Sequence, residues 1–235
     1  MILCLDAGNT RLKWGLREGQ AWRGQGVLAL DDRDGIAALL PAVSENILAC
    51  NVAGAAVAQR IEEIAAAYGV PLEWFRSSAV CCGVTNGYDN PAQLGADRWA
   101  ALVGARGMHA GNALVVMAGT ATTVDVLDAE GKFRGGLILP GLELMQKALA
   151  RNTAGLPEAY GVYRDLPTNT DDAIVSGALH ATLGAVERMC RPMSADFCVL
   201  LSGGAADELA PHLGLPLRRV DNLVLEGLAR VAARC

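Results

Sequence analysis

The chain has few of the residues that build metal clusters, nucleic-acid surfaces or disulfide frameworks. Aromatic residues make up 5% of its 235 residues, and its three histidines, His109, His180 and His212, lack metal-ligand spacing. None of the seven cysteines forms a Cys-x-x-Cys pair, which argues against a zinc or redox motif. Acidic residues outnumber basic ones, 25 to 20, so no basic surface for nucleic acid is expected. A small molecule is the better candidate partner.

Long apolar runs are also missing. No stretch approaches the roughly 20 uncharged residues of a membrane span. The apolar residues 1–5 run directly into Asp6, without a basic leader or a small-residue cleavage site, so no signal peptide is expected. We therefore expect a cytoplasmic protein without a membrane partner. A hydrophobic content of 52% with 19% charged residues is typical of a packed enzyme rather than a disordered chain.

Two loops of similar composition stand about half a chain length apart. The first, Asp6-Ala7-Gly8-Asn9-Thr10, lies between apolar runs and predicts a β-hairpin whose turn offers N–H groups, hydroxyls and a carboxylate to a metal–phosphate group. The second, Met117-Ala118-Gly119-Thr120-Ala121, aligns with it glycine on glycine. Either loop alone is also an ordinary hairpin turn. Their repetition in matching context favours a duplicated fold with one phosphate loop in each half.

The periodicity of the first half predicts strands around residues 1–5, 14–16 and 21–30, a short helix to residue 40, a strand over 46–53, a helix over 54–68 and a strand over 71–75. This is the element order of an RNase H-like half domain. In the second half we expect a hairpin over 113–127, a strand over 133–139, helices to about 150, from about 170 and to about 213, strands over 196–201 and 217–220, and a final helix. We therefore predict an α/β protein with lobes 1–108 and 109–235.

The segment that joins the two halves carries candidate substrate residues. After turn formers at 86–91, Asp97 and Arg98 begin a predicted helix, where the positive end of the helix dipole favours a carboxylate. A capping Asp beside a surface Arg is the alternative interpretation. Gly135 and Gly136 interrupt a strand pattern, which predicts either a close approach by backbone or substrate or a β-bulge. Gly203 and Gly204 in a strand-to-helix turn would let a nucleobase approach.

Two phosphate hairpins and a Gly-Gly turn describe the ATP site of the actin and sugar-kinase (ASKHA) superfamily, which lies in a cleft between two RNase H-like lobes. The motifs Asp6-x-Gly8-Asn9-Thr10, Gly95-x-Asp97-Arg98, Gly119-Thr120-Ala121-Thr122-Thr123-x-Asp125 and Gly135-Gly136-x-Ile138-x-Pro140-Gly141 resemble those of type III pantothenate kinases, in particular the branch that includes Bvg accessory factors. The resemblance implies ATP-dependent phosphorylation of pantothenate to 4′-phosphopantothenate, the first step of coenzyme A biosynthesis.

The resemblance also implies a role for each matching residue. Asp97 corresponds to the catalytic proton acceptor, and Arg98 to the arginine that binds the substrate carboxylate. Asp6 would orient the Mg²⁺–phosphate group. Residues implied to line the ATP phosphates are Asp6, Ala7, Gly8, Asn9, Thr10, Arg11, Leu12, Lys13 and Thr120. Residues implied to bind pantothenate are Tyr88, Gly95, Ala96, Asp97 and Arg98, with Thr170 contributed across the interface of a homodimer; a simple helix cap is the alternative for Thr170.

The chain departs from the family pattern at Met117. Many members carry an Asp there that binds a monovalent cation, K⁺ or NH₄⁺, and a thioether cannot replace that carboxylate for a hard cation. We therefore predict ATP and Mg²⁺ as cofactors, with weak or absent K⁺ dependence. Two other functions remain open at this point: a kinase for another small hydroxy acid, and a nucleotide-binding regulatory protein. The intact Asp6, Asp97 and Arg98 weigh against the regulatory alternative.

Overall fold

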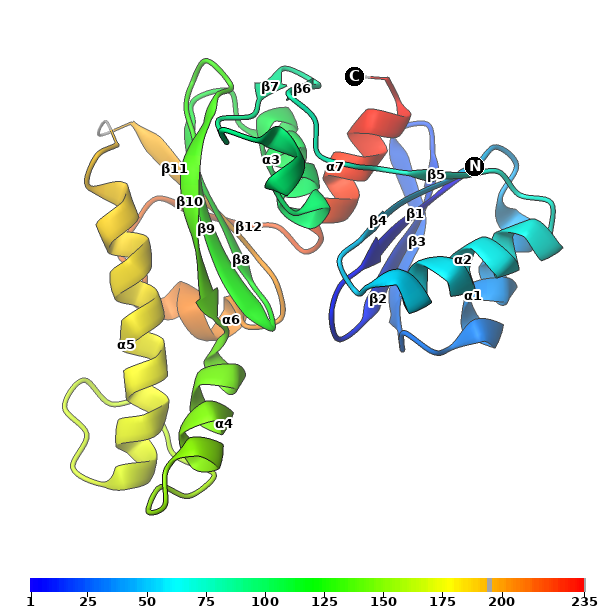
Figure 1. The fold of residues 1–235 in the computed structure, drawn as a ribbon. Coiled ribbons are helices and arrows are strands. Elements are labelled where there is room, and N and C mark those ends of the chain that lie inside the picture. The colour runs from blue at the N-terminus through cyan, green and yellow to red at the C-terminus, as the bar shows by residue number, and fades with distance from the viewer. Residues whose placement is uncertain (194–195, 235) are drawn as a thin grey trace. The chain divides into compact units, whose positions relative to one another are not determined.

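A computed structural model of the chain describes residues 1–193 and 196–234. The described residues form two compact units, each with its own five-stranded sheet (Figure 1). Unit 1 comprises Met1–Ala110, Gly131–Phe133 and the chain from Asn222 onward, and unit 2 comprises Gly111–Glu130 and Arg134–Asp221. The two units are described separately below.

The sheet of unit 1 is organised around its central strand. In spatial order its strands are β3 (Ala21–Leu28), β2 (Leu12–Glu18), β1 (Ile2–Ala7), β4 (Ile47–Asn51) and β5 (Leu72–Trp74). Strand β1 runs antiparallel to β2 and parallel to β4. Parallel strands are covered on both faces, which explains why β1 and β4 are continuous apolar runs in the sequence. The predicted hairpin and the strand predicted over 46–53 are confirmed.

The helices of unit 1 pack with this sheet to form a hydrophobic core. They are α1 (Arg33–Leu39), the 3₁₀ turn η1 (Leu40–Ala42), α2 (Ala55–Ala67), the 3₁₀ turn η2 (Pro91–Gln93), α3 (Ala96–Met108) and α7 (Leu223–Ala232). Val57, Ile61 and Ile64, spaced four and three residues apart, form the buried face of α2, whereas Tyr68, expected on the same face, is the C-cap and is exposed. Gly69 follows with a φ of +66°, which suits the helix stop predicted there.

Unit 2 repeats the sheet topology of unit 1. Its strands, in spatial order, are β10 (Phe133–Pro140), β9 (Ala121–Leu127), β8 (Asn112–Ala118), β11 (Phe197–Ser202) and β12 (Leu217–Arg219). Central strand β8 is antiparallel to β9 and parallel to β11, as β1 is to β2 and β4. Strands β1 and β8 end at Ala7 and Ala118, so the two predicted loops occupy equivalent places. The predicted duplication is confirmed.

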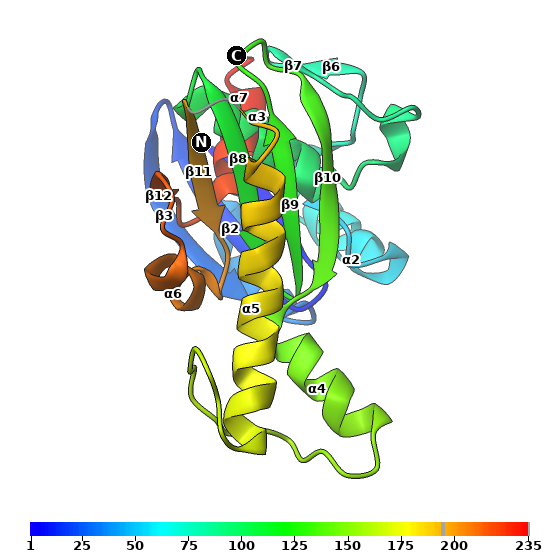
Figure 2. The same cartoon turned by 90° about the vertical axis from the view of Figure 1, so that its left-hand side faces the viewer.

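A long helix lies along one face of this second sheet. The second half of helix α5 (Thr170–Cys190) lies along the strands, and its first half extends beyond them with α4 (Leu142–Asn152) packed beside it (Figure 2). Leu179, Leu183 and Val186 of α5 join the core formed with β8 and β11. Across the described residues, none of the helices is both long and apolar enough to cross a membrane.

Three features differ from the sequence-based expectation. The helix expected to reach residue 213 ends early, as α6 (Ala206–Leu209) followed by the 3₁₀ turn η3 (Ala210–His212), because Pro211 cannot continue an α-helix. A short hairpin of β6 (Val80–Cys81) and β7 (Val84–Thr85) was not expected. Helix α7, which the division at residue 108 assigns to the C-terminal lobe, belongs to unit 1.

Helix α7 lies in unit 1 because glycines let it approach α3 closely. A Cβ atom at Gly227 would overlap the carbonyl oxygen of Ala100, and one at Gly104 would lie 2.5 Å from the carbonyl oxygen of Leu223. Neither glycine has a left-handed φ, so the requirement is for space rather than for backbone freedom. The two helices therefore pack with their backbones nearly in contact.

Gly227→Ala should lower the free energy of unfolding by about 1–3 kcal/mol, because an added methyl group overpacks the α3–α7 contact. Gly184→Ala on α5 is the matched control, since its Cβ would meet open space. That change should leave stability unchanged or raise it by about 1 kcal/mol. Urea unfolding of both variants measures the difference, and equal effects would mean that the close approach does not limit the packing.

Candidate active site

Asp6 is a nearly buried carboxylate at the end of the central strand of unit 1. It is 6% exposed and pairs in register with Lys13 of β2 on one side and with Cys50 of β4 on the other. The Cys50 thiol donates a hydrogen bond to Asp6 Oδ1 over 3.6 Å. Burial raises the pKa of Asp6 from 3.8 to about 6, while the charge of Lys13 lowers it and that of Asp97 raises it. Burial, and then the charges of Asp6 and Asp97, raise the pKa of Cys50 well above its usual value.

The turn after Asp6 presents polar groups to solvent. The Gly8 N–H donates to the carbonyl of Arg11 over 3.2 Å, which closes the hairpin. The side chains of Asn9, Thr10 and Arg11 are exposed. Ala7 and Leu12 are fully buried, so among the residues implied to line the phosphates these two can offer only their backbones.

Helix α3 begins with the predicted substrate segment. Gly95 is its N-cap, Ala96 its first residue and Asp97 lies in its first turn. Because Gly95 has no side chain to cap the helix, the carboxylate of Asp97 takes part of that task, with Oδ1 accepting the N–H of Arg98 over 2.8 Å. The capping interpretation of Asp97 is therefore correct, and it uses only one of the two carboxylate oxygens.

Arg98 is buried rather than on the surface, so the surface interpretation is wrong. Its side chain is 5% exposed, and Nη1 donates to the hydroxyl of Tyr88 over 2.9 Å. The guanidinium lies 5.7 Å from the centre of the Tyr88 ring and 5.8 Å from that of Phe133. An arginine held by a hydroxyl and two aromatic rings presents its planar donors in a defined direction, which suits a carboxylate ligand.

A pocket of about 610 Å³ opens beside the substrate segment in unit 1. Gly95 and Ala96 form part of its wall, together with side chains of β5 and the residues that follow it. The hydroxyl of Ser77, which also lines this pocket, is buried and has no hydrogen-bond partner among the described residues. Sequence patterns did not point to Ser77, because nothing in its local sequence marks it as near Gly95.

The second loop closes in the same way as the first. The Gly119 N–H donates to the carbonyl of Ala121 over 3.1 Å, and the Gly141 N–H donates to the carbonyl of Thr120 over 2.9 Å. The Thr120 side chain is exposed. Met117 stands where Asp6 stands in unit 1, paired with Thr123 and Ser202. A Cβ at Gly136 would overlap the Asp125 carboxylate, so this glycine serves a close approach between neighbouring strands.

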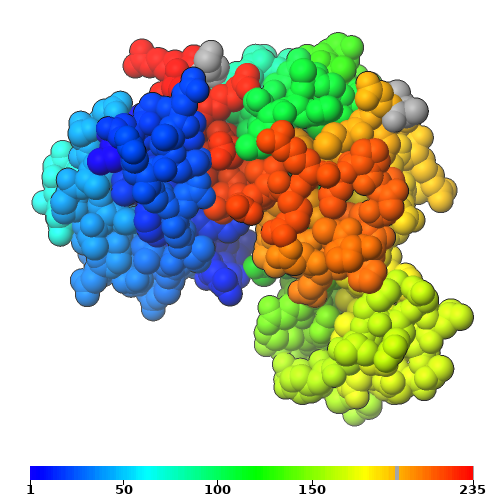
Figure 3. Space-filling view, turned by 180° about the vertical axis from the view of Figure 1, so that it is seen from behind, coloured from blue at the N-terminus to red at the C-terminus, as the bar shows by residue number. Residues whose placement is uncertain are grey.

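Thr170 is the first residue of α5 and is exposed. The helix cap is the neighbouring Asn169, whose side chain accepts the N–H of Asp172 over 2.9 Å. The cap alternative for Thr170 is therefore wrong. Around it, residues of about 145–170 stand out from the rest of unit 2 (Figure 3). This segment exposes large apolar side chains, namely Leu144, Leu149, Tyr160, Val162 and Leu166.

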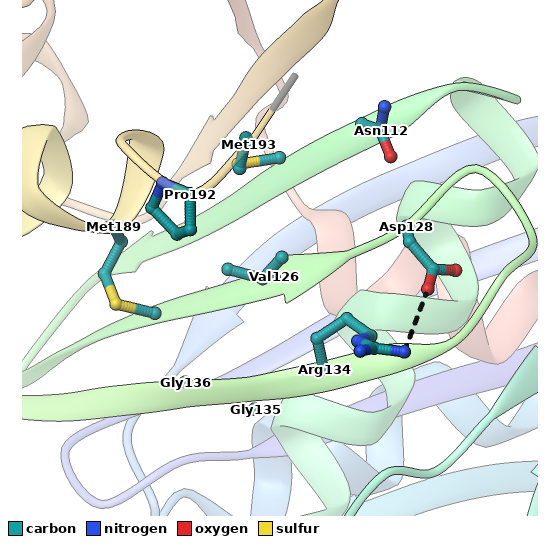
Figure 4. A pocket seen from close by; sticks show the side chains of 9 residues that line it. All are labelled: Asn112, Val126, Asp128, Arg134, Gly135, Gly136, Met189, Pro192 and Met193. Atoms are coloured by element: carbon teal, nitrogen blue, oxygen red, sulfur yellow. Dashed lines mark ion pairs between the residues drawn. The ribbon is translucent and has the colours of Figure 1, made fainter.

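A second pocket of about 610 Å³ lies in unit 2, between the outer strands and the end of α5 (Figure 4). It combines an apolar wall with an ion pair between Arg134 and Asp128, whose charged atoms are 3.8 Å apart. Its described lining consists of Asn112, Val126, Asp128, Arg134, Gly135, Gly136, Met189, Pro192 and Met193. Of the predicted motifs, this pocket includes only the glycine pair.

Unit 1 thus brings together most of the predicted chemistry. The charges of Lys13 and Asp97 both act on Asp6. Arg98, the residue after Asp97 on α3, donates to the Tyr88 hydroxyl. Thr120 and Thr170 belong to unit 2. In the described chain no group of three or more His, Cys, Asp or Glu residues gathers as a metal site. Cys50 is the neighbour that sequence analysis missed, because parallel strand pairing is not visible in local patterns.

The raised pKa of Asp6 predicts how stability depends on pH in metal-free buffer. The folded protein binds this proton more tightly than the unfolded chain, so stability should fall as pH rises from about 4 to about 6 and stay level above that. Asp6→Asn should remove this fall and raise stability at pH 7 by at most about 3 kcal/mol. Urea unfolding across this pH range tests it, with Asp31→Asn, an exposed carboxylate, as control. A fall that persists in Asp6→Asn would contradict the assignment.

Comparison with known proteins agrees with this geometry. Residues 2–192 match the model of the type III pantothenate kinase family. A type III pantothenate kinase from Aromatoleum aromaticum is 54% identical, over 99% of this chain and 98% of its own length. One from Dechloromonas aromatica is 46% identical over the full length of both chains.

Solved structures share the fold at low sequence identity. A candidate transcriptional activator of the Baf family from Campylobacter jejuni is 20% identical with a TM-score of 0.69, over 99% of this chain and 98% of its own. A candidate 2-dehydro-3-deoxygalactonokinase from Sinorhizobium meliloti is 17% identical with a TM-score of 0.65, over 100% and 99%. This is the fold of sugar kinases and actin-like ATPases, as predicted. The chain belongs to the type III pantothenate kinase family.

Proposed function

We propose that this protein transfers the γ-phosphoryl group of ATP to the primary hydroxyl of pantothenate, which gives 4′-phosphopantothenate and ADP and begins coenzyme A biosynthesis. One observation carries the proposal. In a member of this family, unit 1 holds two neighbouring carboxylates, Asp6 and Asp97, next to a buried arginine that is oriented by Tyr88. Together these groups meet the needs of a phosphoryl transfer to an acceptor with a hydroxyl at one end and a carboxylate at the other.

Asp97 is the proposed proton acceptor. As the pantothenate hydroxyl oxygen forms its bond to the γ-phosphorus, the bond from that phosphorus to the bridging oxygen of ADP breaks, and the hydroxyl proton passes to Asp97. Oδ1 of Asp97 already accepts the Arg98 N–H, which fixes the side chain at the start of α3. The other oxygen can then face the hydroxyl.

Arg98 is the proposed clamp for the carboxylate of pantothenate. Its planar guanidinium carries several N–H donors in a fixed plane, and its Nη1 donates to the Tyr88 hydroxyl, which orients that plane. Burial strengthens its attraction for an anion, because little water screens the charge. Tyr88, Gly95 and Ala96 would complete this end of the substrate pocket, beside the cavity that their segment lines.

The ATP phosphates are proposed to lie against the first loop and Thr120. Asp6 and Lys13 would face them, with the backbones of Ala7, Gly8 and Leu12 and the exposed Asn9, Thr10 and Arg11 around them. Mg²⁺ fits Asp6, because this nearly buried carboxylate has no cationic hydrogen-bond partner within the described residues and a hard cation stabilises such an oxygen ligand. When bound, the metal neutralises charge on the transferring phosphoryl group.

The position of Met117 bears on monovalent cations. Met117 takes the strand position that a carboxylate takes in unit 1, and its two register partners, Thr123 and Ser202, offer hydroxyl oxygens rather than a carboxylate. A K⁺ ion would lack the carboxylate that many family members supply. We therefore infer that turnover depends weakly or not at all on K⁺ or NH₄⁺.

We also propose a cytoplasmic homodimer whose pantothenate pocket is completed by Thr170 of the second subunit. Two observations support this. Thr170 is exposed and is not used as the helix cap, and the segment leading to it exposes Tyr160 and Leu166, which are 88% and 89% accessible. Exposed apolar side chains of this size are typical of an interaction surface. In this proposal the chain up to residue 108 carries the first phosphate loop and the substrate segment, and the chain from residue 109 carries the second loop.

The first test is ADP production by the purified protein with ATP and Mg²⁺, with and without pantothenate. Pantothenate-dependent turnover is expected, with similar rates in K⁺ and in Na⁺ at equal ionic strength. A large K⁺ activation would contradict the inference drawn from Met117. ATP binding without turnover would favour a regulatory protein, and turnover with a different hydroxy acid alone would favour another acceptor.

Asp97→Asn should lower kcat by a factor of about 10² to 10⁴, as expected when a positioned base is removed, while nucleotide affinity is kept. Asn retains the acceptor for the Arg98 N–H. Steady-state kinetics with calorimetry of nucleotide binding measures both effects. Asp34→Asn, which changes a first-turn carboxylate of α1, is the control. Near-normal kcat in Asp97→Asn would remove this residue from the role of base.

Arg98→Lys should raise the KM for pantothenate by about ten- to a hundred-fold and change the KM for ATP much less, because the lysine keeps the charge but loses the planar pair of donors. Arg106→Lys near the end of the same helix is the control, since that side chain donates to a backbone carbonyl, that of Ala110. Equal changes in both KM values would argue against a carboxylate clamp.

A further inference from the structure

The carboxylate of Asp6 has one side-chain hydrogen-bond donor within the described part of the chain, the thiol of Cys50. Cys50 is fully buried and its Sγ lies 3.6 Å from Oδ1, while Asp6 is 6% exposed. The mechanism proposed above gives Cys50 no role. We therefore ask what its contact does for Asp6.

The contact follows from strand register rather than from flexible side chains. Asp6 and Cys50 are direct partners in the parallel pairing of β1 with β4, so both side chains point to the same side of the sheet. Strand β4 is itself held on its far side by β5. Cys50 is short and buried among packed residues, which leaves its sulfur little freedom to move away from the carboxylate.

We propose that Cys50 is a positioning residue for Asp6: its thiol holds one carboxylate oxygen so that the other faces the metal–phosphate group. This inference rests on the role proposed for Asp6 above. A thiol suits the task because it donates a weak, uncharged hydrogen bond. It orients the carboxylate without neutralising it, whereas a lysine or arginine there would compete with the metal ion.

Unit 2 offers an internal comparison. The equivalent pair there is Met117 and Ser202, which occupy the same register positions on β8 and β11. Where Met117 replaces the carboxylate, the Ser202 hydroxyl donates to the carbonyl of Asp221, 3.4 Å away. In unit 1, the donor at this register position, the Cys50 thiol, bonds to the Asp6 carboxylate. In unit 2, where Met117 replaces the aspartate, the equivalent Ser202 hydroxyl bonds to a backbone carbonyl.

The other charged groups around Asp6 do not provide this function. Lys13 of β2 and Asp97 of α3 act on Asp6 through their charges, and no hydrogen bond to Asp6 from either is found in the described residues. Orientation of the carboxylate is therefore left to Cys50. Removing the thiol should leave these charges in place while freeing the carboxylate to rotate.

The test measures by calorimetry how tightly the protein binds AMP-PNP, a non-hydrolysable ATP analogue, with and without Mg²⁺. The ratio of the Kd in EDTA to the Kd in Mg²⁺ gives the tightening that the metal ion causes. Cys50→Ala should reduce this ratio by about 3- to 10-fold, the effect of losing one hydrogen bond. Cys50→Val, which refills the space without a donor, should do the same. Cys50→Ser, which keeps a donor, should retain most of the ratio. Urea unfolding checks that each variant is folded.

Cys4→Ala is the matched control, because Cys4 is an equally buried thiol on β1 for which the described residues show no hydrogen bond to Asp6. Its ratio should equal that of the unaltered protein. The positioning role is overturned if Cys50→Ala and Cys50→Val keep the ratio, or if Cys4→Ala or Cys50→Ser loses it equally. Asp6→Asn separates the two hypotheses: if it abolishes the ratio while the donor-free variants do not, only the role of Cys50 fails. If Asp6→Asn keeps the ratio, the proposed role of Asp6 fails as well.

Discussion

The pairing of β1 with β4 is the interaction on which the rest of unit 1 depends. Both strands are buried along most of their length, and this burial brings the polar end of β1 into a region with little water. Asp6 is therefore a carboxylate whose ionised form lacks full solvation, as its raised pKa reflects. Such a group destabilises the free protein, and the proposed Mg²⁺ would offset that cost on binding.

The second sheet has the same architecture without a buried carboxylate at the end of its central strand. Its strand order and pairing match those of the first sheet, but Asp6, Lys13 and Cys50 are replaced by Met117, Thr123 and Ser202 at the matching positions. All three replacements are uncharged. The duplicated architecture therefore keeps two turns of similar connection, the proposed phosphate loops, while only the first has charged residues at these three positions.

Local patterns in the sequence were sufficient for the hairpins, for α2 with its glycine stop, and for the repeated loops, because these depend on neighbours a few residues apart. The family resemblance supplied the roles of Asp97 and Arg98. Long-range packing was not accessible in this way. Nothing near residue 227 indicates that α7 returns to α3, and nothing near residue 50 indicates that a cysteine in an apolar run lies beneath Asp6. Both facts arise from contacts between distant segments.

The packing of α3 links these distant contacts to the chemistry. Glycines at 104 and 227 let α3 and α7 approach backbone to backbone, and most residues of α3 from Arg98 onward are buried. The first turn of α3 is therefore anchored by the packed helix that follows it. Successive residues of a helix point about 100° apart, so Asp97 and Arg98 necessarily face different directions. One acts on Asp6 through its charge, and the other reaches Tyr88. Adjacent residues on a fixed helix can thus serve the two ends of a small substrate, with their separation set by backbone geometry.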